Sequence, residues 1–259
     1  LTDAFPNNGF FDVADPNNPY YARYANRQYE TRGSAGDSAW FEWQRLFQFG
    51  LARAPLELIA HVVENDRPYT EILTADYTLL NPQTGAMLDP TLSFPDQDPR
   101  RFQVGHNRGQ IRVDESFQGE FVEGQGHRVD GHSGFLDLPH AGLLNEPAFL
   151  SRYPSTETNR NRARARWTLF HFLGLDIEKS AARTTDPVAL ADNNNPTLNN
   201  PHCTVCHQTL DPIAGAFQNF GDEGWFRDSW RGLDALPETY KHSPGSPYQD
   251  GDTWYRDMR

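Results

Sequence analysis

The chain has 259 residues, of which 23 are basic and 35 acidic, and its formal net charge at pH 7 is −12. This acidity argues against nucleic acid as a partner, because phosphate groups attract basic surfaces. Only 37% of the residues are hydrophobic, yet the chain holds 17 Phe, 10 Tyr and 6 Trp, which predicts a loop-rich globular protein packed on aromatic rings. No apolar run reaches the length that crosses a bilayer, so we expect no membrane span.

Apolar side chains recur with a helical period in two stretches of the N-terminal third. The first predicts a helix from Ser38 to Leu51, with Asp37 or Ser38 as its N-cap. Pro55 suits the first turn of a second helix, which we expect to run to Asn65. The sequence therefore predicts two consecutive helices with a break between them.

The middle of the chain alternates short elements with turns. Residues 65–81 predict a short helix that leads into an extended segment. Residues 82–139 are rich in Pro and Gly and predict turns, with short strands at Gln110–Val113 and Glu120–Val122. A longer helix is expected from about Glu157 to Leu173.

Near the C-terminal third, Cys203-Thr204-Val205-Cys206-His207 forms a C-x-x-C-H motif, which is typical of covalent c-type haem attachment. Two thiols one helical turn apart can each add to a haem vinyl group. The adjacent imidazole then lies beneath the iron as an axial ligand. Since Cys203 and Cys206 are the only cysteines, a disulfide framework is excluded.

Three other interpretations of the cysteine pair are a redox dithiol, half of a zinc site, or two unrelated buried cysteines. No pair of histidines lies at zinc-finger spacing from the cysteines. A thioredoxin-like dithiol needs a βαβ context, whereas sequence rich in Asn, Pro and Thr precedes this pair from Asp192 to Pro201. We therefore predict one covalent haem c, with His207 as the proximal iron ligand.

Three segments resemble the planctomycete-type exported c-type cytochromes known as the PSCyt and PSD domain families, whose function is largely unknown. They read NDRPYTEILTADYTLLN at 65–81, HAGLLNEPAFL at 140–150 and CTVCHQTLDPIAGAFQNFGDEG at 203–224. Asn145 stands where the family usually has Thr, and the Gly-rich stretch between Asn81 and His140 departs from the family pattern. The segments cover 50 positions.

The motif, the expected helices and the resemblance together predict a mainly α protein with long irregular loops and at most a few short strands. Residues 1–139 would form an N-terminal helical and loop-rich region that packs on a c-type cytochrome-like haem domain at 140–259. Haem attachment of this kind occurs outside the bacterial cytoplasm, so we expect a periplasmic or extracellular protein. The first residues of the given sequence do not read as a signal peptide, so we expect that Leu1 is not the translational start.

Candidate haem contacts follow from the same segments. His140, which matches the second segment, is the first candidate for the distal iron ligand, and a hydrogen-bonded structural histidine is the alternative. Met258, 51 residues after His207, is the runner-up. Arg164 and Arg166 lie in the helix before the motif and are candidates to bind the haem propionates, with a solvated basic helix face as the equal alternative.

The Asp211-Pro212 pair is expected to end the haem-bearing turn and to begin another helix, with Asp211 as its N-cap. That helix would present apolar residues to the porphyrin.

The distal ligand decides which function the sequence favours. A strong second ligand is typical of electron transfer, whereas an open position permits peroxide chemistry. Because no acid–base constellation is specific enough to assign, we expect a monohaem c-type cytochrome that transfers electrons within a larger redox assembly. Its partners would be redox proteins. A peroxidase-like haem enzyme with an open distal site is the alternative, and a subunit whose haem is structural is a third interpretation.

Overall fold

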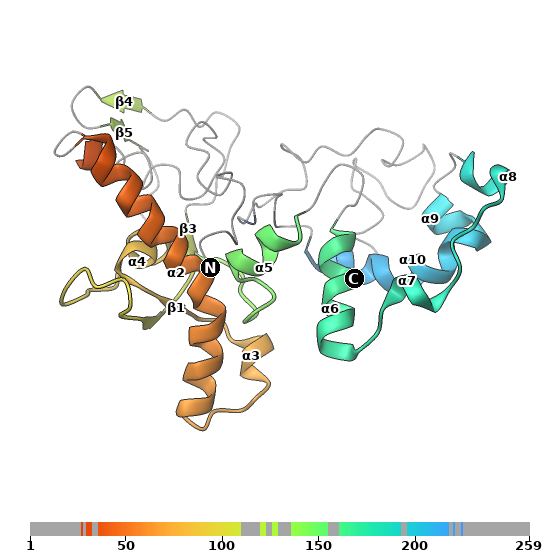
Figure 1. Cartoon of the computed structure of the whole chain (residues 1–259), viewed down its shortest axis with the longest axis horizontal. Helices are drawn as coiled ribbons and strands as arrows, with labels where there is room; N and C mark the ends of the chain where they lie inside the picture. The colour runs from red at the N-terminus through yellow and green to blue at the C-terminus, as the bar shows by residue number, and fades with distance from the viewer. Residues whose placement is uncertain are drawn as a thin grey trace. The chain divides into compact units, whose positions relative to one another are not determined.

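The computed structural model describes residues 27, 30–32, 36–109, 120–122, 126–128, 136–154, 161–192, 196–217, 220 and 224. Helices predominate among them (Figure 1), and each strand has only two or three residues. This confirms the prediction of a mainly α protein.

The chain divides into two compact units. Unit 1 contains Leu1–Arg152 and Glu223–Asp228, and unit 2 contains Tyr153–Asp222 and Ser229–Arg259. Residues 140–152, which the sequence analysis placed in the haem domain, belong to unit 1 by this division. The boundary after residue 139 stays a prediction.

Unit 1 is built on helix α2 (Asp37–Glu64), which is continuous over 28 residues. Its buried side chains recur every three or four positions, so that one stripe of the helix faces the core. The large members of this stripe are Trp40, Trp43, Phe47, Leu51, Leu58 and Val62. Residue Gly36, and not Asp37 or Ser38, occupies the N-cap.

The predicted break at Pro55 is wrong, because α2 runs through it. A proline inside a helix removes one backbone hydrogen bond and costs about 3 kcal/mol. The buried side chains of Leu51 and Leu58 lie on either side of Pro55 along the same stripe. Burying each of them contributes roughly 2 kcal/mol, so continuing the helix offsets the cost of the proline.

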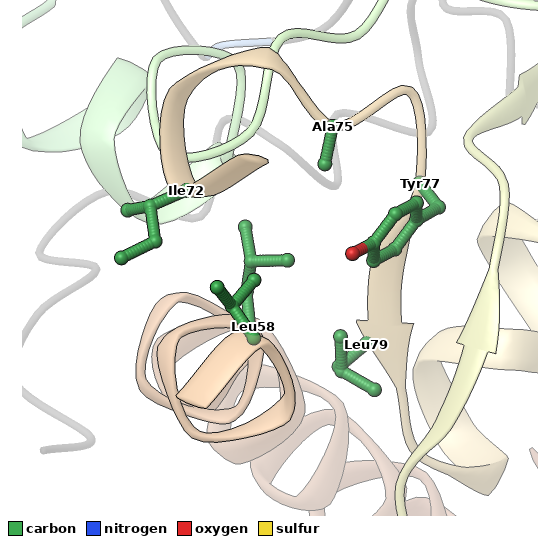
Figure 2. Close-up of a cluster of buried hydrophobic side chains, with 6 residues drawn as sticks. Leu58, Ile72, Ala75, Tyr77 and Leu79 are labelled. Atoms are coloured by element: carbon green, nitrogen blue, oxygen red, sulfur yellow. The ribbon is translucent and has the colours of Figure 1, made fainter. Parts of the chain in front are cut away.

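A hydrophobic cluster joins α2 to the segment that follows it. Leu58 of α2 lies close to Ile72 of helix α3 (Glu71–Thr74), as Figure 2 shows. It also lies close to Leu79 of strand β1 (Thr78–Leu80) and to Tyr77, the residue before this strand. Ala75 completes the turn between α3 and β1 in the same cluster. The short helix and extended segment predicted over 65–81 are thus confirmed.

The remaining elements of unit 1 are short. Asn81 caps helix α4 with its side chain and forms a capping box with Thr84. Strand β1 pairs with β2, β3 with β6 and β4 with β5, all antiparallel. The bounds are Pro82–Leu88 for α4, Gln103–Gly105 for β2, Arg108–Gly109 for β3, Glu120–Val122 for β4, Gly126–Arg128 for β5, Leu136–Asp137 for β6 and Pro147–Arg152 for α5.

The sequence predicted two short strands in residues 82–139, and the structure describes the residues of one of them. The strand expected at Glu120–Val122 is β4, which confirms it. Gln110–Val113 lies outside the described residues.

Helix α2 is long and apolar enough to cross a membrane, by length and composition alone. The core helix of a soluble protein passes the same test, and 39% of the relevant window is buried inside the structure. The expected lack of a membrane span therefore stays a prediction.

The part of unit 2 that the structure describes is made mainly of helices. A buried cluster of Ala165, Leu169, Ile177, Leu210 and Ala214 holds three of them together. The bounds are Arg162–Leu173 for α6, Ile177–Ser180 for α7, Pro187–Leu190 for α8, Pro196–Asn199 for α9 and Pro201–Ala216 for α10. Helix α6 ends at Leu173, as predicted, and Gly174 follows it in the left-handed conformation.

Helix α10 carries the C-x-x-C-H motif and corrects a second prediction from sequence. Asn200 caps it by accepting a hydrogen bond from the backbone N–H of His202, and Pro201 occupies the first turn. The helix then continues through Pro212, so Asp211 is an interior residue and no new helix begins there. The buried side chains of Leu210 and Ala214 keep the two halves of α10 in the same cluster, which offsets the cost of the proline.

Candidate haem site

The two cysteines and the histidine of the motif lie on the N-terminal half of α10. Cys203 and Cys206 are both free thiols and are partly exposed. The Cys206 Sγ lies 3.9 Å from the Ser180 hydroxyl and 3.8 Å from the Ile177 carbonyl oxygen, both in α7. Because α10 is helical here, the two thiols lie one turn apart, as attachment to one porphyrin requires.

The ring of His207 contacts a carboxylate that lies one turn further along α10. Its Nδ1 lies 3.1 Å from Oδ1 and 3.0 Å from Oδ2 of Asp211. A carboxylate only accepts hydrogen bonds, so in the neutral imidazole Nδ1 carries the proton and donates a hydrogen bond to Asp211. The lone pair is then on Nε2, where a metal can bind.

Asp211 in turn binds Arg162 of helix α6. The guanidinium donates two hydrogen bonds, from Nε to Oδ1 at 2.7 Å and from Nη2 to Oδ2 at 3.2 Å. Asp211 is fully buried, whereas the side chains of Arg162 and His207 are 14% and 22% exposed. A buried carboxylate is costly unless it is paired and hydrogen-bonded, and this one has a cation and an imidazole as partners.

The residues present fit a covalent haem c. Two partly exposed thiols stand one turn apart, and the neighbouring imidazole has its Nδ1 engaged so that Nε2 remains for iron. A carboxylate behind a histidine is the usual partner of a metal-bound imidazole in proteins.

The contacts of Asp211 were not predicted from the sequence. The spacing of four residues between His207 and Asp211 was a usable signal, because side chains four apart meet on a helix. The predicted helix break at Asp211 concealed it. Arg162 gave no local signal, since it lies 49 residues before Asp211.

Arg164, predicted as a propionate ligand, is fully buried in unit 2. Its guanidinium donates to the carbonyl oxygens of Tyr153 at 3.0 Å and Phe220 at 2.8 Å, and to the side-chain oxygen of Asn161 at 2.8 Å. These bonds join the start of α6 to the residues after α10. The propionate role of Arg164 stays a prediction.

Arg166, the second candidate, forms ion pairs within unit 2. Its guanidinium lies 3.4 Å from the Asp176 carboxylate and 3.0 Å from the Glu178 carboxylate, and it packs over the Trp167 ring. It is partly exposed. Its propionate role also stays a prediction.

His140, the first candidate for the distal ligand, belongs to unit 1. Its side chain is 1% exposed, and within the described part of the chain neither ring nitrogen has a hydrogen-bond partner. Its Nε2 lies 3.8 Å from Oε1 of the equally buried Glu146, which accepts a hydrogen bond of 2.5 Å from the Thr78 hydroxyl. The runner-up, Met258, lies outside the described residues.

Burial controls the protonation of both groups in this pair. It lowers the pKa of His140 to about 4, against the opposing effect of Asp76. It raises the pKa of Glu146 to about 8, although the Thr78 hydroxyl opposes this. At pH values between these, both side chains are neutral, so the 3.8 Å approach is not an ion pair.

The region that contains the C-x-x-C-H motif matches a known family model. Residues 140–230 match the family model PSCyt3, described as a protein of unknown function (DUF1588). This is the planctomycete cytochrome-type family that the sequence resemblance indicated. The PSCyt3 match covers about a third of the chain and includes α6 and α10. No curated protein and no solved structure matches the sequence.

Proposed function

We propose that this chain is an exported monohaem c-type cytochrome that transfers electrons as a subunit or domain of a larger redox assembly. One observation carries the proposal: in α10, the C-x-x-C-H motif is followed one turn later by a buried carboxylate that binds His207 Nδ1. The thiols would attach the porphyrin, and the imidazole would bind its iron through Nε2.

The chain's own residues would then hold the cofactor in place. Cys203 and Cys206 would provide the covalent bonds, and Asp211 keeps the imidazole of His207 oriented. A haem bound here would supply a one-electron redox centre. The net charge of −12 would steer a positively charged redox partner toward the protein.

Several parts of the proposal rest on the sequence. Covalent haem attachment implies export. His140 remains the proposed distal ligand of the iron, with Met258 as the runner-up. Arg164 and Arg166 remain the proposed propionate partners. A peroxidase-like enzyme with an open distal site is the alternative, because only the distal ligand separates the two functions.

The first test is covalent haem attachment. The chain is exported in a bacterium that matures c-type cytochromes, alongside a variant with Cys203→Ala and Cys206→Ala. We expect the parent chain to carry one haem by intact mass and the double variant to carry none. Val205→Ala, at the exposed position between the thiols, is the matched control and should retain the haem.

The second test is the absorption spectrum of the oxidised and dithionite-reduced chain. A sharp low-spin α-band is expected for an electron-transfer haem. A high-spin reduced spectrum together with peroxide turnover would instead support the peroxidase-like alternative. A parent chain without haem, purified from cells that mature another c-type cytochrome, would refute the proposed function.

A further inference from the structure

We infer that Asp211 and Arg162 are positioning residues that set the reduction potential of the haem site with opposite signs. Asp211 would lower the potential through His207, and Arg162 would raise it by drawing charge away from Asp211. This inference rests on the proposed function and adds to it a role for two residues outside the C-x-x-C-H motif.

The geometry assigns the tautomer of His207. Both oxygens of Asp211 lie within 3.1 Å of Nδ1, so the proton of the neutral ring is held on Nδ1. Asp211 lies in the same helix, four residues on, and its carboxylate is fully buried. The ring is therefore held in one orientation by a group that packing keeps in place.

The same contact changes the electronic character of the ring. A hydrogen bond from Nδ1–H to a carboxylate makes the imidazole a more basic ligand. A more basic ligand stabilises the ferric state over the ferrous state, which lowers the reduction potential. Because Asp211 is buried, little water screens its charge.

Arg162 acts on the other side of Asp211. Its two hydrogen bonds occupy both carboxylate oxygens, and so they compete with His207 for the negative charge of Asp211. Removing the guanidinium would strengthen the hold of Asp211 on the Nδ1 proton. It would also remove a positive charge near the iron, and both effects lower the potential.

The test measures the reduction potential of the haem-loaded chain and of three variants. Asp211→Asn should shift the potential in the positive direction, and Arg162→Gln should shift it in the negative direction. Asp186→Asn is the control, because Asp186 is a carboxylate of unit 2 whose side chain is 43% exposed and which makes no described contact with His207, Arg164 or Arg166. It should leave the potential close to that of the parent.

A second readout separates positioning from general stability. In the full-length chain without haem, long-range nitrogen–proton NMR reports which ring nitrogen of His207 carries the proton. We expect a single Nδ1–H form in the parent and in Asp186→Asn, and a mixed or altered form in Asp211→Asn. If either single variant fails to fold, the double variant Asp211→Asn with Arg162→Gln, which carries no unpaired charge, replaces it and should show the altered ring.

The outcomes distinguish this inference from the proposed function. If the chain carries haem but Asp211→Asn matches Asp186→Asn in both potential and ring proton, the inference is overturned and the proposed function stands. Shifts of the same sign in Asp211→Asn and Arg162→Gln would also overturn it. A chain without haem overturns the proposed function and the potential-setting role together, while the ring-proton measurement still shows whether Asp211 positions His207.

Discussion

His140 Nε2 lies 3.8 Å from Glu146 Oε1, and each side chain exposes only 1% of its surface. The pKa of the histidine is lowered and that of the carboxyl is raised by burial. As pH rises, the titration of Glu146 lowers the free energy of unfolding, whereas the titration of His140 raises it. The pH ranges over which these two effects act overlap only in part.

This pair predicts a loss of stability on the alkaline side. Glu146 releases its proton at a pKa of about 8 in the folded chain but near its ordinary value of 4.5 in the unfolded one, so its contribution falls as pH rises between them. His140 has a pKa of about 4 in the folded chain against an ordinary 6.5, so its contribution to the free energy of unfolding rises as pH increases between these two values. Between pH 4.5 and 6.5 the effects of the two groups on the free energy of unfolding cancel. From pH 6.5 to 8 the free energy of unfolding should fall by about 2 kcal/mol in urea titrations.

Glu146→Gln tests the assignment, because glutamine keeps an acceptor for the Thr78 hydroxyl but does not titrate. The fall above pH 6.5 should disappear in this variant. Glu64→Gln, at an exposed position on α2, is the control and should retain the fall. Persistence of the fall in Glu146→Gln would assign it to another group.

Arg162 is also predicted to stabilise unit 2, because Asp211 is fully buried and depends on it. Breaking a buried ion pair by removing one partner costs about 3–5 kcal/mol. Since Arg162 is 14% exposed and water can approach it, we expect Arg162→Gln to lower the free energy of unfolding by about 3 kcal/mol. Chemical denaturation of the haem-free and haem-loaded chains measures this.

The matched control is Arg183→Gln. Arg183 also pairs with a carboxylate, that of Glu178, but its side chain is 83% exposed. Exposed pairs of this kind contribute about 0–1 kcal/mol, so the change should be small. Equal losses in the two variants would show that burial of Asp211 does not determine the effect.

Local signals in the sequence predicted the parts of the fold that local chemistry determines. The end of α6 before Gly174 and the strand at Glu120–Val122 are of this kind. Pro55 and Pro212 misled the prediction, because each reads as a helix start but lies inside a helix. Burial of side chains on both sides decided these two cases, and burial is a property of the tertiary structure.

The residues of the candidate site also fall into those that local sequence predicts and those that only the tertiary structure brings together. The C-x-x-C-H motif is contiguous, so Cys203, Cys206 and His207 could be named from sequence. Asp211 was hidden by the mistaken helix break, and Arg162 reaches it only because α6 packs on α10. A contact between residues 49 apart leaves no periodic pattern to detect.

The distal ligand gives a spectroscopic prediction. In the haem-loaded chain, His140→Ala should abolish the low-spin α-band, because alanine offers no ligand to the iron. His202→Ala is the control and should keep the band, since His202 is adjacent to Cys203 and its ring cannot reach the opposite face of the haem. A low-spin spectrum that survives in His140→Ala would show that the prediction is wrong and would favour Met258.

The last prediction concerns Gly142, in the segment 140–150 that resembles the family. Its φ is 50°, and a Cβ at this position would clash with the backbone oxygen of Ile72. The N–H of Gly142 donates to Ala75 O at 2.8 Å and that of Leu143 donates to Ile72 O at 2.9 Å, so the two segments cannot separate without losing both bonds.

Gly142→Ala should therefore lower the free energy of unfolding by more than about 3 kcal/mol, because it adds a backbone clash to an unfavourable φ. Gly174→Ala provides the comparison, since its φ is 68° and a Cβ there would meet nothing within 4 Å. It should cost only about 1 kcal/mol, which is the conformational penalty alone. Urea unfolding of both variants measures the difference, and equal losses would mean that the close approach of Gly142 to Ile72 does not stabilise the fold.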